Sequence, residues 1–369
     1  MKIKAAVLQQ FGTPLSLEEV ELAPPGPGEV LVRIAAAGLC HSDLSFIDGT
    51  QTHISLPAVL GHEAAGVVVE LGAGVDDLQV GDHVVTTFWP SCGQCLACRI
   101  GRPTLCERGM QTLLSGTLST GGRRLTWKGN PMNHYLGCSV FAGHAVVGRA
   151  SLVRIDRQVP LQHAALFGCA VLTGVGAIVN AGKVQPGDSV AIVGVGGVGL
   201  CAVLGALAVG ATRIIAVDTN PEKLVAALEL GATHGFNAAE AGCVEAIRGL
   251  TGMGVDCAFE FAGSAKAMET AFQLTKPGGT TICAGLPSAA HSFALPQNTV
   301  VCEERTVKGC FFGSCVPSRD LPRFLQLFQC GRLPVDKIIS HTLPFAEIGE
   351  GFKRLKEGRA LRQIVLPPN

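Results

Sequence analysis

Four cysteines near residue 100 have the residue type and spacing of a metal site. Cys92, Cys95, Cys98 and Cys106 form a C-x2-C-x2-C-x7-C run in a chain of 369 residues. Thiolates this close together can complete a tetrahedral zinc site with no open position for water or substrate. Segment 88–109 is rich in Gly, Pro and Arg and lacks an amphipathic pattern, so we expect metal to order it. The run predicts a structural zinc.

Disulfides and chance clustering are the alternative explanations for this run, because the chain contains 15 Cys. The tight spacing disfavours chance. Disulfides are disfavoured because the sequence from Met1 begins with a strand-like pattern rather than a secretory leader, and many thiols would remain unpaired. The same features favour a reducing, cytoplasmic setting.

A second motif is the glycine-rich stretch 194–199, Gly-Val-Gly-Gly-Val-Gly. It follows an apolar, strand-like run and opens a helical one, which is the context that a dinucleotide-binding loop requires. The first glycine would permit a sharp turn, the second a close approach of backbone to pyrophosphate, and the third tight packing of helix on strand. The residues expected to bind the dinucleotide here are Gly194, Gly196, Gly197, Val198 and Gly199.

An acidic residue at the end of the next predicted strand strengthens this interpretation. The Asp218 carboxylate can bind both ribose hydroxyls of the adenosine and would repel a 2′-phosphate, so NAD is favoured over NADP. Lys223 lies close enough in the sequence to reach the same ribose. A packing turn in a glycine-rich chain is the alternative, and Asp218 argues against it.

Charge and hydropathy exclude two classes of partner. Lys plus Arg number 29 and Asp plus Glu number 29, so nothing indicates binding to nucleic acid or to an acidic membrane surface. The run Val190–Ala211 has no charged residue and is long enough to span a bilayer. Its glycines fall at turn-forming positions, so a buried strand, a turn and a buried helix explain it better than a membrane span.

The sequence contains two kinds of region, one with mostly strand patterns and one in which strand and helix patterns alternate. Residues up to about 170 read as short strands separated by turns, including 5–8, 30–36 and 64–71. Strand and helix patterns then alternate, which predicts an α/β domain with a doubly wound parallel sheet. The expected strands are 189–193, 213–217, 257–261 and 280–284, and the expected helices are 198–209, 221–230 and 265–274. After about residue 312 the pattern of apolar residues becomes irregular again and ends in an expected strand at 362–366. The α/β domain is therefore expected to be inserted into a mostly β domain built from both ends of the chain.

Cys40, His62 and Cys169 are further candidates for metal ligands. Their spacing in the sequence does not link them, and each can equally be a buried thiol or a core histidine. At this level the assignment of the three stays open.

Four motifs together resemble a known family. Gly61-His-Glu-Ala-Ala-Gly66, Val80-Gly-Asp82, the four-cysteine run and the 194–199 loop occur in the order found in zinc-dependent medium-chain alcohol dehydrogenases. Bacterial aryl and allylic primary-alcohol dehydrogenases and class III-like members are the most similar groups. The resemblance implies a GroES-like, mostly β catalytic domain, residues 1–170 and 313–369, interrupted by a Rossmann NAD-binding domain, residues 171–312.

This resemblance also implies the chemistry. Cys40, His62 and Cys169 match the ligands of a catalytic zinc, so two zinc ions per chain are expected. Two thiolates and a neutral imidazole leave one coordination position open, where the hydroxyl pKa of a bound alcohol falls and hydride transfer to nicotinamide becomes easier. The expected activity is oxidation of primary alcohols to aldehydes with NAD, and the reverse reduction.

Other positions take their expected roles from the same resemblance. Ser42 would relay the alcohol proton, with Ser45 standing where many relatives have a relay histidine. His41 would contact the pyrophosphate and is the nearest candidate to shuttle the proton. The remaining matches are Asp43, which orients His62; Glu63, behind the metal; Arg362, at the pyrophosphate; and Thr173, at the nicotinamide.

Phe88, Tyr135, Phe141 and Leu286 match positions that line the substrate pocket, although some of these side chains can equally be core. An aromatic, apolar pocket favours benzylic, allylic or medium-chain primary alcohols. A thiol-adduct formaldehyde dehydrogenase is the alternative enzyme, but Gln51, His53 and Met110 replace the charged residues that hold glutathione in those relatives. A non-catalytic NAD-binding protein is the alternative from another class. Segment 106–137 is carried by dimeric family members, so a homodimer is expected.

Overall fold

A computed structural model describes residues 1–287 and 291–368, and the chain separates into two compact units. The first comprises Met1–Cys169, Val316–Leu325 and Ile339–Asn369, and the second comprises Ala170–Cys315 and Gln326–Ile338. The chain enters the second unit at Ala170, returns to the first at Val316, and returns to it again at Ile339. All of residues 313–369 are expected from the sequence to belong to the mostly β domain. In the structure, residues 326–338 belong to the second unit instead.

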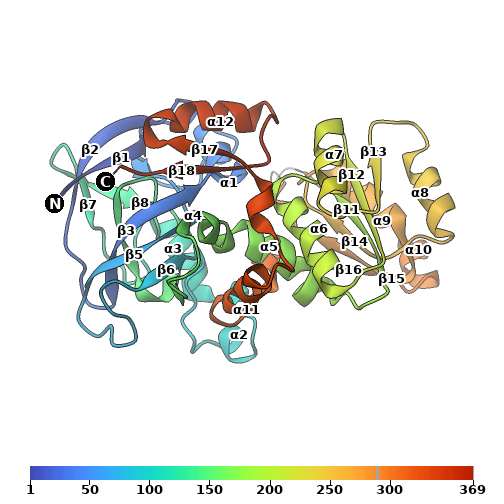
Figure 1. The fold of residues 1–369 in the computed structure, drawn as a ribbon, viewed down its shortest axis with the longest axis horizontal. Coiled ribbons are helices and arrows are strands. Elements are labelled where there is room, and N and C mark those ends of the chain that lie inside the picture. The colour runs from blue at the N-terminus through green and yellow to red at the C-terminus, as the bar shows by residue number, and fades with distance from the viewer. Residues whose placement is uncertain (288–290, 369) are drawn as a thin grey trace. The chain divides into compact units, whose positions relative to one another are not determined.

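The first unit is mostly β (Figure 1). A closed barrel has the strand order β1-β2-β7-β8-β4, and a second sheet has the order β10-β6-β5-β3-β18-β17 with β9 also paired to β3. The strands are β1 (Lys2–Leu8), β2 (Ser16–Leu22), β3 (Glu29–Gly38), β4 (Ala58–Val59), β5 (Ala64–Leu71), β6 (His83–Thr86), β7 (Leu125–Trp127), β8 (Asn130–His134), β9 (His144–Gly148), β10 (Leu152–Ile155), β17 (Ile339–Pro344) and β18 (Arg362–Leu366). The helices are α1 (His41–Ile47), α2 (Leu96–Arg99), α3 (Glu107–Ser115), α4 (Leu161–Ala164) and α12 (Ile348–Lys356).

The second unit is a parallel sheet in the order β13-β12-β11-β14-β15-β16, with helices between successive strands. This order reverses direction at β11, as in Rossmann folds, and it confirms the predicted doubly wound sheet. The strands are β11 (Ser189–Val193), β12 (Arg213–Asp218), β13 (His234–Asn237), β14 (Val255–Glu260), β15 (Thr275–Cys283) and β16 (Thr306–Gly309). The helices are α5 (Ala170–Gly176), α6 (Gly197–Val209), α7 (Pro221–Glu229), α8 (Cys243–Thr251), α9 (Ala265–Leu274) and α10 (Gln297–Cys302), and α11 (Pro317–Gln329) begins in the first unit and ends in the second.

The difference in the domain ranges has a packing reason. After α11, the Arg332 guanidinium donates to the Ala208 carbonyl of α6 at 3.0 Å, and Leu333, Val335 and Ile338 are fully buried. These apolar side chains bring the segment into the second unit. A short irregular stretch carries little periodicity, so its partner could not be read from the sequence.

The uncharged run 190–211 forms β11, a turn and α6, as predicted. Among the described residues, no single helix is long and apolar enough to cross a membrane. The consecutive segments Leu161–Gly168 and Ala170–Gly182 reach that length and hydropathy only when they are counted together.

Candidate active site

The three residues whose spacing left them unlinked lie together in the first unit. The ligand atoms of Cys40, His62 and Cys169 are all within 4.8 Å of one another, and all three side chains are buried. Two sulfurs and one imidazole nitrogen at this separation fit the donor set of a zinc that keeps one position open. The geometry therefore fits the catalytic metal that the resemblance implies.

Local structure explains how Cys40 and His62 are positioned. Cys40 precedes α1 in extended backbone, and its N–H donates to the Asp43 carboxylate at 3.2 Å, as expected at a helix N-terminus. Gly61 has φ +90°, and a Cβ there would lie 2.7 Å from the Phe141 ring, so only glycine fits before His62. Cys169 follows a 3-10 turn, Ala165–Gly168, at the end of the first unit.

Asp43 connects these elements. Its carboxylate is buried, accepts from the Gly61 N–H at 3.2 Å and lies 3.2 Å from Nδ1 of His62. Burial lowers the pKa of His62, but the neighbouring Asp43 and Cys40 raise it, and the net pKa is well above the usual range. Because Nδ1 contacts the Asp43 carboxylate, Nε2 is the ring nitrogen that remains for a metal.

The thiols of Cys40 and Cys169 are hydrogen-bonded to each other. The hydrogen bond from Cys169 lowers the pKa of Cys40 well below its usual range, whereas that hydrogen bond and burial raise the pKa of Cys169 well above it. Ser42 Oγ lies 3.7 Å from the sulfur of Cys40, so its hydroxyl stands beside the same cluster. Ser45 Oγ donates to the His41 carbonyl at 2.9 Å, and His41 is exposed at the start of α1.

Behind the cluster, Glu63 and Arg362 form a buried ion pair. A Cβ at Gly38 would lie 2.7 Å from the Glu63 carboxylate and 3.0 Å from the Arg362 guanidinium, so glycine makes room for the pair. Arg362 was predicted at the pyrophosphate. The structure shows it as the partner of Glu63, and its pyrophosphate role stays a prediction.

Sequence reasoning missed Thr86. Its buried hydroxyl accepts from the Ala64 N–H at 3.0 Å and donates to the Ala64 carbonyl at 3.2 Å, which fixes the chain directly after His62 and Glu63. A threonine ending the apolar strand β6 was the available signal.

Two aromatic rings stand edge-on to His62. The ring centroids of Phe88 and Tyr135 lie 5.2 and 5.8 Å from that of His62. Burial raises the pKa of Tyr135 well above its usual range, so the phenol stays neutral. Tyr135 and Phe141 are both fully buried core side chains, with the Phe141 ring 5.8 Å from that of Phe352, whereas Phe88 is half-buried and Leu286, on the second unit, is 70 % exposed.

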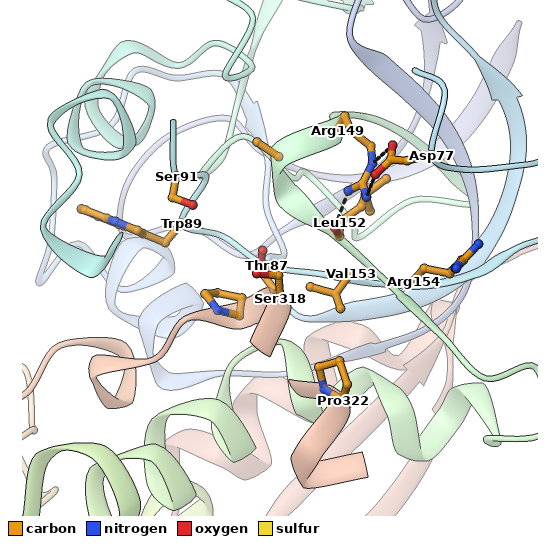
Figure 2. A pocket seen from close by; sticks show the side chains of 12 residues that line it. Asp77, Thr87, Trp89, Ser91, Arg149, Leu152, Val153, Arg154, Ser318 and Pro322 are labelled. Carbon is orange, nitrogen blue, oxygen red and sulfur yellow. Dashed lines mark hydrogen bonds and ion pairs between the residues drawn. The ribbon is translucent and has the colours of Figure 1, made fainter. Parts of the chain in front are cut away.

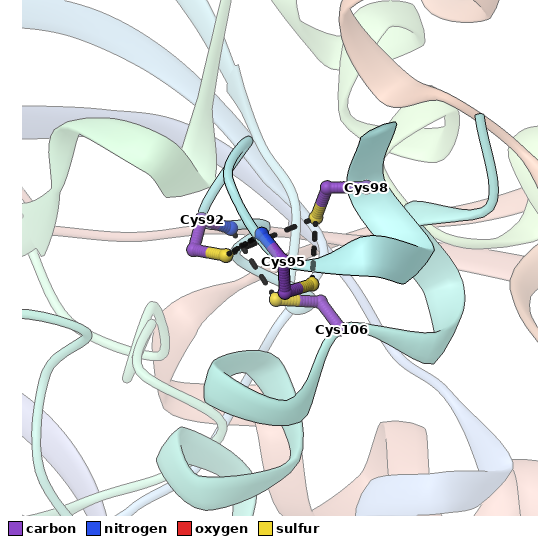
Figure 3. A group of neighbouring side chains, drawn as sticks. All are labelled: Cys92, Cys95, Cys98 and Cys106. Atoms are coloured by element: carbon purple, nitrogen blue, oxygen red, sulfur yellow. Dashed lines mark hydrogen bonds between the residues drawn. The ribbon is translucent and has the colours of Figure 1, made fainter. Parts of the chain in front are cut away.

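The four cysteines of the predicted structural site also converge (Figure 3). The sulfur of Cys98 lies 3.5 Å from that of Cys95 and 4.0 Å from that of Cys92, and the Cys92 N–H donates to the Cys106 sulfur at 3.3 Å. Backbone N–H groups lower the pKa of Cys92 to about 6, whereas burial raises that of Cys98 to about 12. All 15 cysteines lie among the described residues and are free thiols, so no disulfide there competes with a metal.

Little apolar packing holds the lobe that carries these cysteines. Leu96, the first residue of α2, and Ile100, directly after this helix, are 75 % and 61 % exposed. Trp89 is the buried anchor, and its ring N–H donates to the Pro103 carbonyl at 2.9 Å. The arrangement supports the expectation that the metal orders this segment.

The nucleotide loop has the geometry that its glycines suggested. Gly194 has φ +91°, a Cβ at Gly196 would meet no atom within 4 Å, and a Cβ at Gly199 would lie 2.0 Å from the Gly194 carbonyl oxygen. Gly197 and Val198 form the first turn of α6. The loop is therefore a tight turn with an open face at a helix N-terminus, which is suited to phosphate.

Asp218 ends β12 beside this loop. Its carboxylate accepts from the Val195 N–H and from the Asn220 N–H, each at 2.9 Å. Lys223 lies half-buried in the first turn of α7, and Thr173 is half-buried in α5.

The first unit also has a surface pocket of about 450 Å³ (Figure 2). Arg149 lies on its wall, but its guanidinium is engaged by the Asp77 carboxylate at 2.5 and 2.8 Å and by the Leu152 carbonyl at 2.7 Å. None of the predicted zinc ligands lines it, so we place the chemistry at the Cys40–His62–Cys169 cluster.

Comparisons with known proteins agree with this site. Residues 26–157 match the family model described as alcohol dehydrogenase GroES-like domain, and residues 197–329 match that of zinc-binding dehydrogenase. An S-(hydroxymethyl)glutathione dehydrogenase of Synechocystis sp. is 37 % identical over 99 % of this chain and 100 % of that protein.

Solved structures give the same result. The alcohol dehydrogenase zinc-binding domain protein of Burkholderia ambifaria is 35 % identical with a TM-score of 0.95, and the benzyl alcohol dehydrogenase of Acinetobacter calcoaceticus is 33 % identical with a TM-score of 0.95. Each match covers 100 % of both chains. With its GroES-like and Rossmann-like units, the chain therefore belongs to the zinc-dependent medium-chain alcohol dehydrogenase family.

Proposed function

We propose that this zinc alcohol dehydrogenase oxidises primary alcohols with a bulky apolar group, such as benzylic, allylic or medium-chain alcohols, and reduces the matching aldehydes with NADH. The observation that carries this proposal is the half-buried ring of Phe88, edge-on to His62. An aromatic ring beside the reacting centre favours an apolar substituent. The similarity to a benzyl alcohol dehydrogenase supports the same substrate class.

The residues of the first unit have distinct roles in this reaction. Cys40, His62 and Cys169 would hold the catalytic zinc, and Cys92, Cys95, Cys98 and Cys106 a structural one. When bound, the catalytic zinc would supply a Lewis acid that lowers the pKa of an alcohol hydroxyl.

Ser42 would receive the alcohol proton, since its hydroxyl lies beside Cys40. Ser45 does not titrate near neutral pH, so the exposed imidazole of His41, or water, takes the proton onward. Asp43 keeps His62 in the orientation that presents Nε2.

A substrate panel tests this function. We expect NADH formation with benzyl, cinnamyl and medium-chain alcohols, without any added thiol. The similarity to an S-(hydroxymethyl)glutathione dehydrogenase favours a second candidate, oxidation of a thiol adduct of formaldehyde. Activity that appears only with formaldehyde and glutathione would establish that candidate instead.

NAD rather than NADP is the proposed cofactor because of Asp218. We expect Asp218→Ala to weaken NAD binding about tenfold or more, since a hydrogen bond from a charged group contributes roughly 1.5–3 kcal/mol. The variant should also narrow the preference for NAD over NADP. Steady-state kinetics with both cofactors measure this change.

Asp188→Ala is the matched control for this variant. Asp188 also accepts a backbone N–H, that of Gln185 at 2.7 Å, but it precedes β11 at the opposite end of the sheet. It should leave the cofactor preference unchanged. Equal use of NAD and NADP by the unmutated enzyme would contradict the role given to Asp218.

We further propose a homodimer that works in the reducing cytoplasm. The 15 free thiols suit that compartment. Segment 106–137, which dimeric members of the family carry, contains α3, β7 and β8. Light scattering on the purified enzyme would give twice the mass of the chain, and a tetramer mass would contradict the proposal.

A further inference from the structure

The second unit buries a carboxylate that neither the sequence analysis nor the proposed mechanism uses. Glu260 is the last residue of β14 and is only 1 % exposed. Strand β14 lies between β11 and β15, so Glu260 sits at the carboxyl end of the middle of the sheet. Carboxylates are seldom buried so completely without a cation.

Backbone N–H groups, rather than a cation, surround this carboxylate. The Gly263 N–H donates to Oε1 in a short hydrogen bond. Burial raises the pKa of Glu260, and the backbone N–H groups of Gly263, Ser264, Ala262 and Gly285 lower it, which leaves the pKa above its usual value. The carboxylate thus organises the turn after β14 and the end of β15.

Three turns touch at this point. A Cβ at Gly194 would lie 2.7 Å from the Ala262 nitrogen, and a Cβ at Gly285 would lie 2.3 Å from the Gly263 nitrogen and 2.7 Å from the Glu260 carboxylate. A Cβ at Gly263 would lie 3.1 Å from the Leu286 carbonyl oxygen. The turns after β11, β14 and β15 therefore pack closely through backbone atoms, and the Glu260 carboxylate and the Ala262 methyl group are the side-chain groups nearest to the junction.

Backbone hydrogen bonds complete the junction. The Phe261 N–H donates to the Val193 carbonyl at 2.8 Å, and the N–H groups of Ala284 and Gly285 both donate to the Glu260 carbonyl at 2.9 Å. The position of the Gly194 turn is thus coupled to the turn that Glu260 holds.

In parallel sheets of this order, dinucleotides bind at the carboxyl ends of the strands. We propose that Glu260 is a positioning residue for the dinucleotide: it fixes the Ala262–Ser264 turn, which in turn sets the Gly194 turn that faces the cofactor. This inference rests on the proposed NAD site. It predicts that the carboxylate affects cofactor affinity although it does not itself touch the cofactor.

Asp256 offers a matched control on the same strand. Its carboxylate accepts from the Ser189 N–H at 2.8 Å and the Ser189 hydroxyl at 2.6 Å and pairs with Lys276, but it lies at the opposite end of β14. Removing it should weaken the sheet without changing the turns at the carboxyl ends.

The experiment compares Glu260→Gln, Glu260→Ala and Asp256→Ala in the zinc-loaded enzyme. NADH affinity is measured by fluorescence titration, the KM for NAD and kcat by steady-state kinetics, and stability by thermal unfolding. We expect Glu260→Ala to lower NADH affinity about tenfold, which corresponds to one hydrogen bond to a charged group. Glu260→Gln, which keeps one acceptor oxygen and the same shape, should lose less, and the effect should appear in the KM for NAD more than in kcat.

Asp256→Ala should lower the unfolding temperature and leave NADH affinity unchanged. Variants of Glu260 that lose stability but retain wild-type NADH affinity would overturn the inference, and so would equal losses of affinity in Glu260→Gln and Asp256→Ala. If Glu260→Ala does not fold, the comparison of Glu260→Gln with Asp256→Ala decides alone. Failure of the unmutated enzyme to bind NADH would instead contradict the proposed function.

Discussion

Replacing Cys169 with alanine is expected to abolish alcohol oxidation while the fold and one zinc ion per chain remain. The variant leaves only Cys40 and His62 of the three clustered ligands. Losing the Lewis acid removes several kcal/mol of transition-state stabilisation, so we expect kcat to fall about 10³-fold or more. Metal analysis and an NADH absorbance assay on the same preparation measure both effects.

Cys138→Ala is the control for this variant. Cys138 is also a fully buried thiol, burial raises its pKa to about 12, and its S–H donates to the Thr87 carbonyl at 3.8 Å. It does not belong to either cysteine cluster, so this variant should keep both zinc ions and most of the activity. A Cys169→Ala enzyme with two zinc ions and full turnover would refute the assignment.

Replacing Cys98 with serine is expected to lower the stability of the protein while leaving its catalytic turnover intact. The lobe around it exposes Leu96 and Ile100, so few apolar contacts remain to hold it once the metal is lost. We expect a loss on the order of 2 kcal/mol and an unfolding midpoint lower by about 4–8 °C. Thermal unfolding and limited proteolysis between residues 88 and 115 test this result.

Cys330→Ser, which replaces an exposed thiol outside the lobe, should change neither the unfolding midpoint nor the proteolysis of the lobe. Zinc content should fall from two ions to one in Cys98→Ser, and the remaining ion should still support turnover. A Cys98→Ser protein with unchanged stability and unchanged zinc content would show that the four cysteines do not hold a metal.

Sequence patterns predicted the strands β11, β12, β14 and β15 and the helices α6, α7 and α9 of the second unit, because each has its own apolar run. They did not predict β13, β16, α5, α8 or α10. β11 and α9 have the expected bounds, whereas β15 begins at Thr275 rather than at 280. Residues 277–279 are Pro-Gly-Gly, which reads as a turn. The backbone there nevertheless extends the strand, with a shift in register against β14.

The candidate site was less accessible to sequence reasoning, because tertiary contacts create it. The four-cysteine run is local and could be identified from its spacing, but Cys40, His62 and Cys169 come together only when α1, β5 and the turn before Cys169 pack. The clearest case is the ion pair of Glu63 with Arg362, whose partners are 299 residues apart. The resemblance to a family linked Cys40, His62 and Cys169 before the structure did, but it did not link Glu63 with Arg362.

The interrupted first unit has a consequence for biosynthesis. Strand β18 pairs with β3 through Val365 and Ala37, and it carries Arg362, the partner of Glu63. A ribosome therefore releases the continuous stretch 170–315 before it has made the last strands of the unit that began the chain. Until those residues emerge, Ala37 and Gly38 of β3 lack their β18 partners, and the Glu63 carboxylate lacks its arginine. During that interval the dinucleotide unit can complete its own sheet, whereas the zinc-ligand unit cannot.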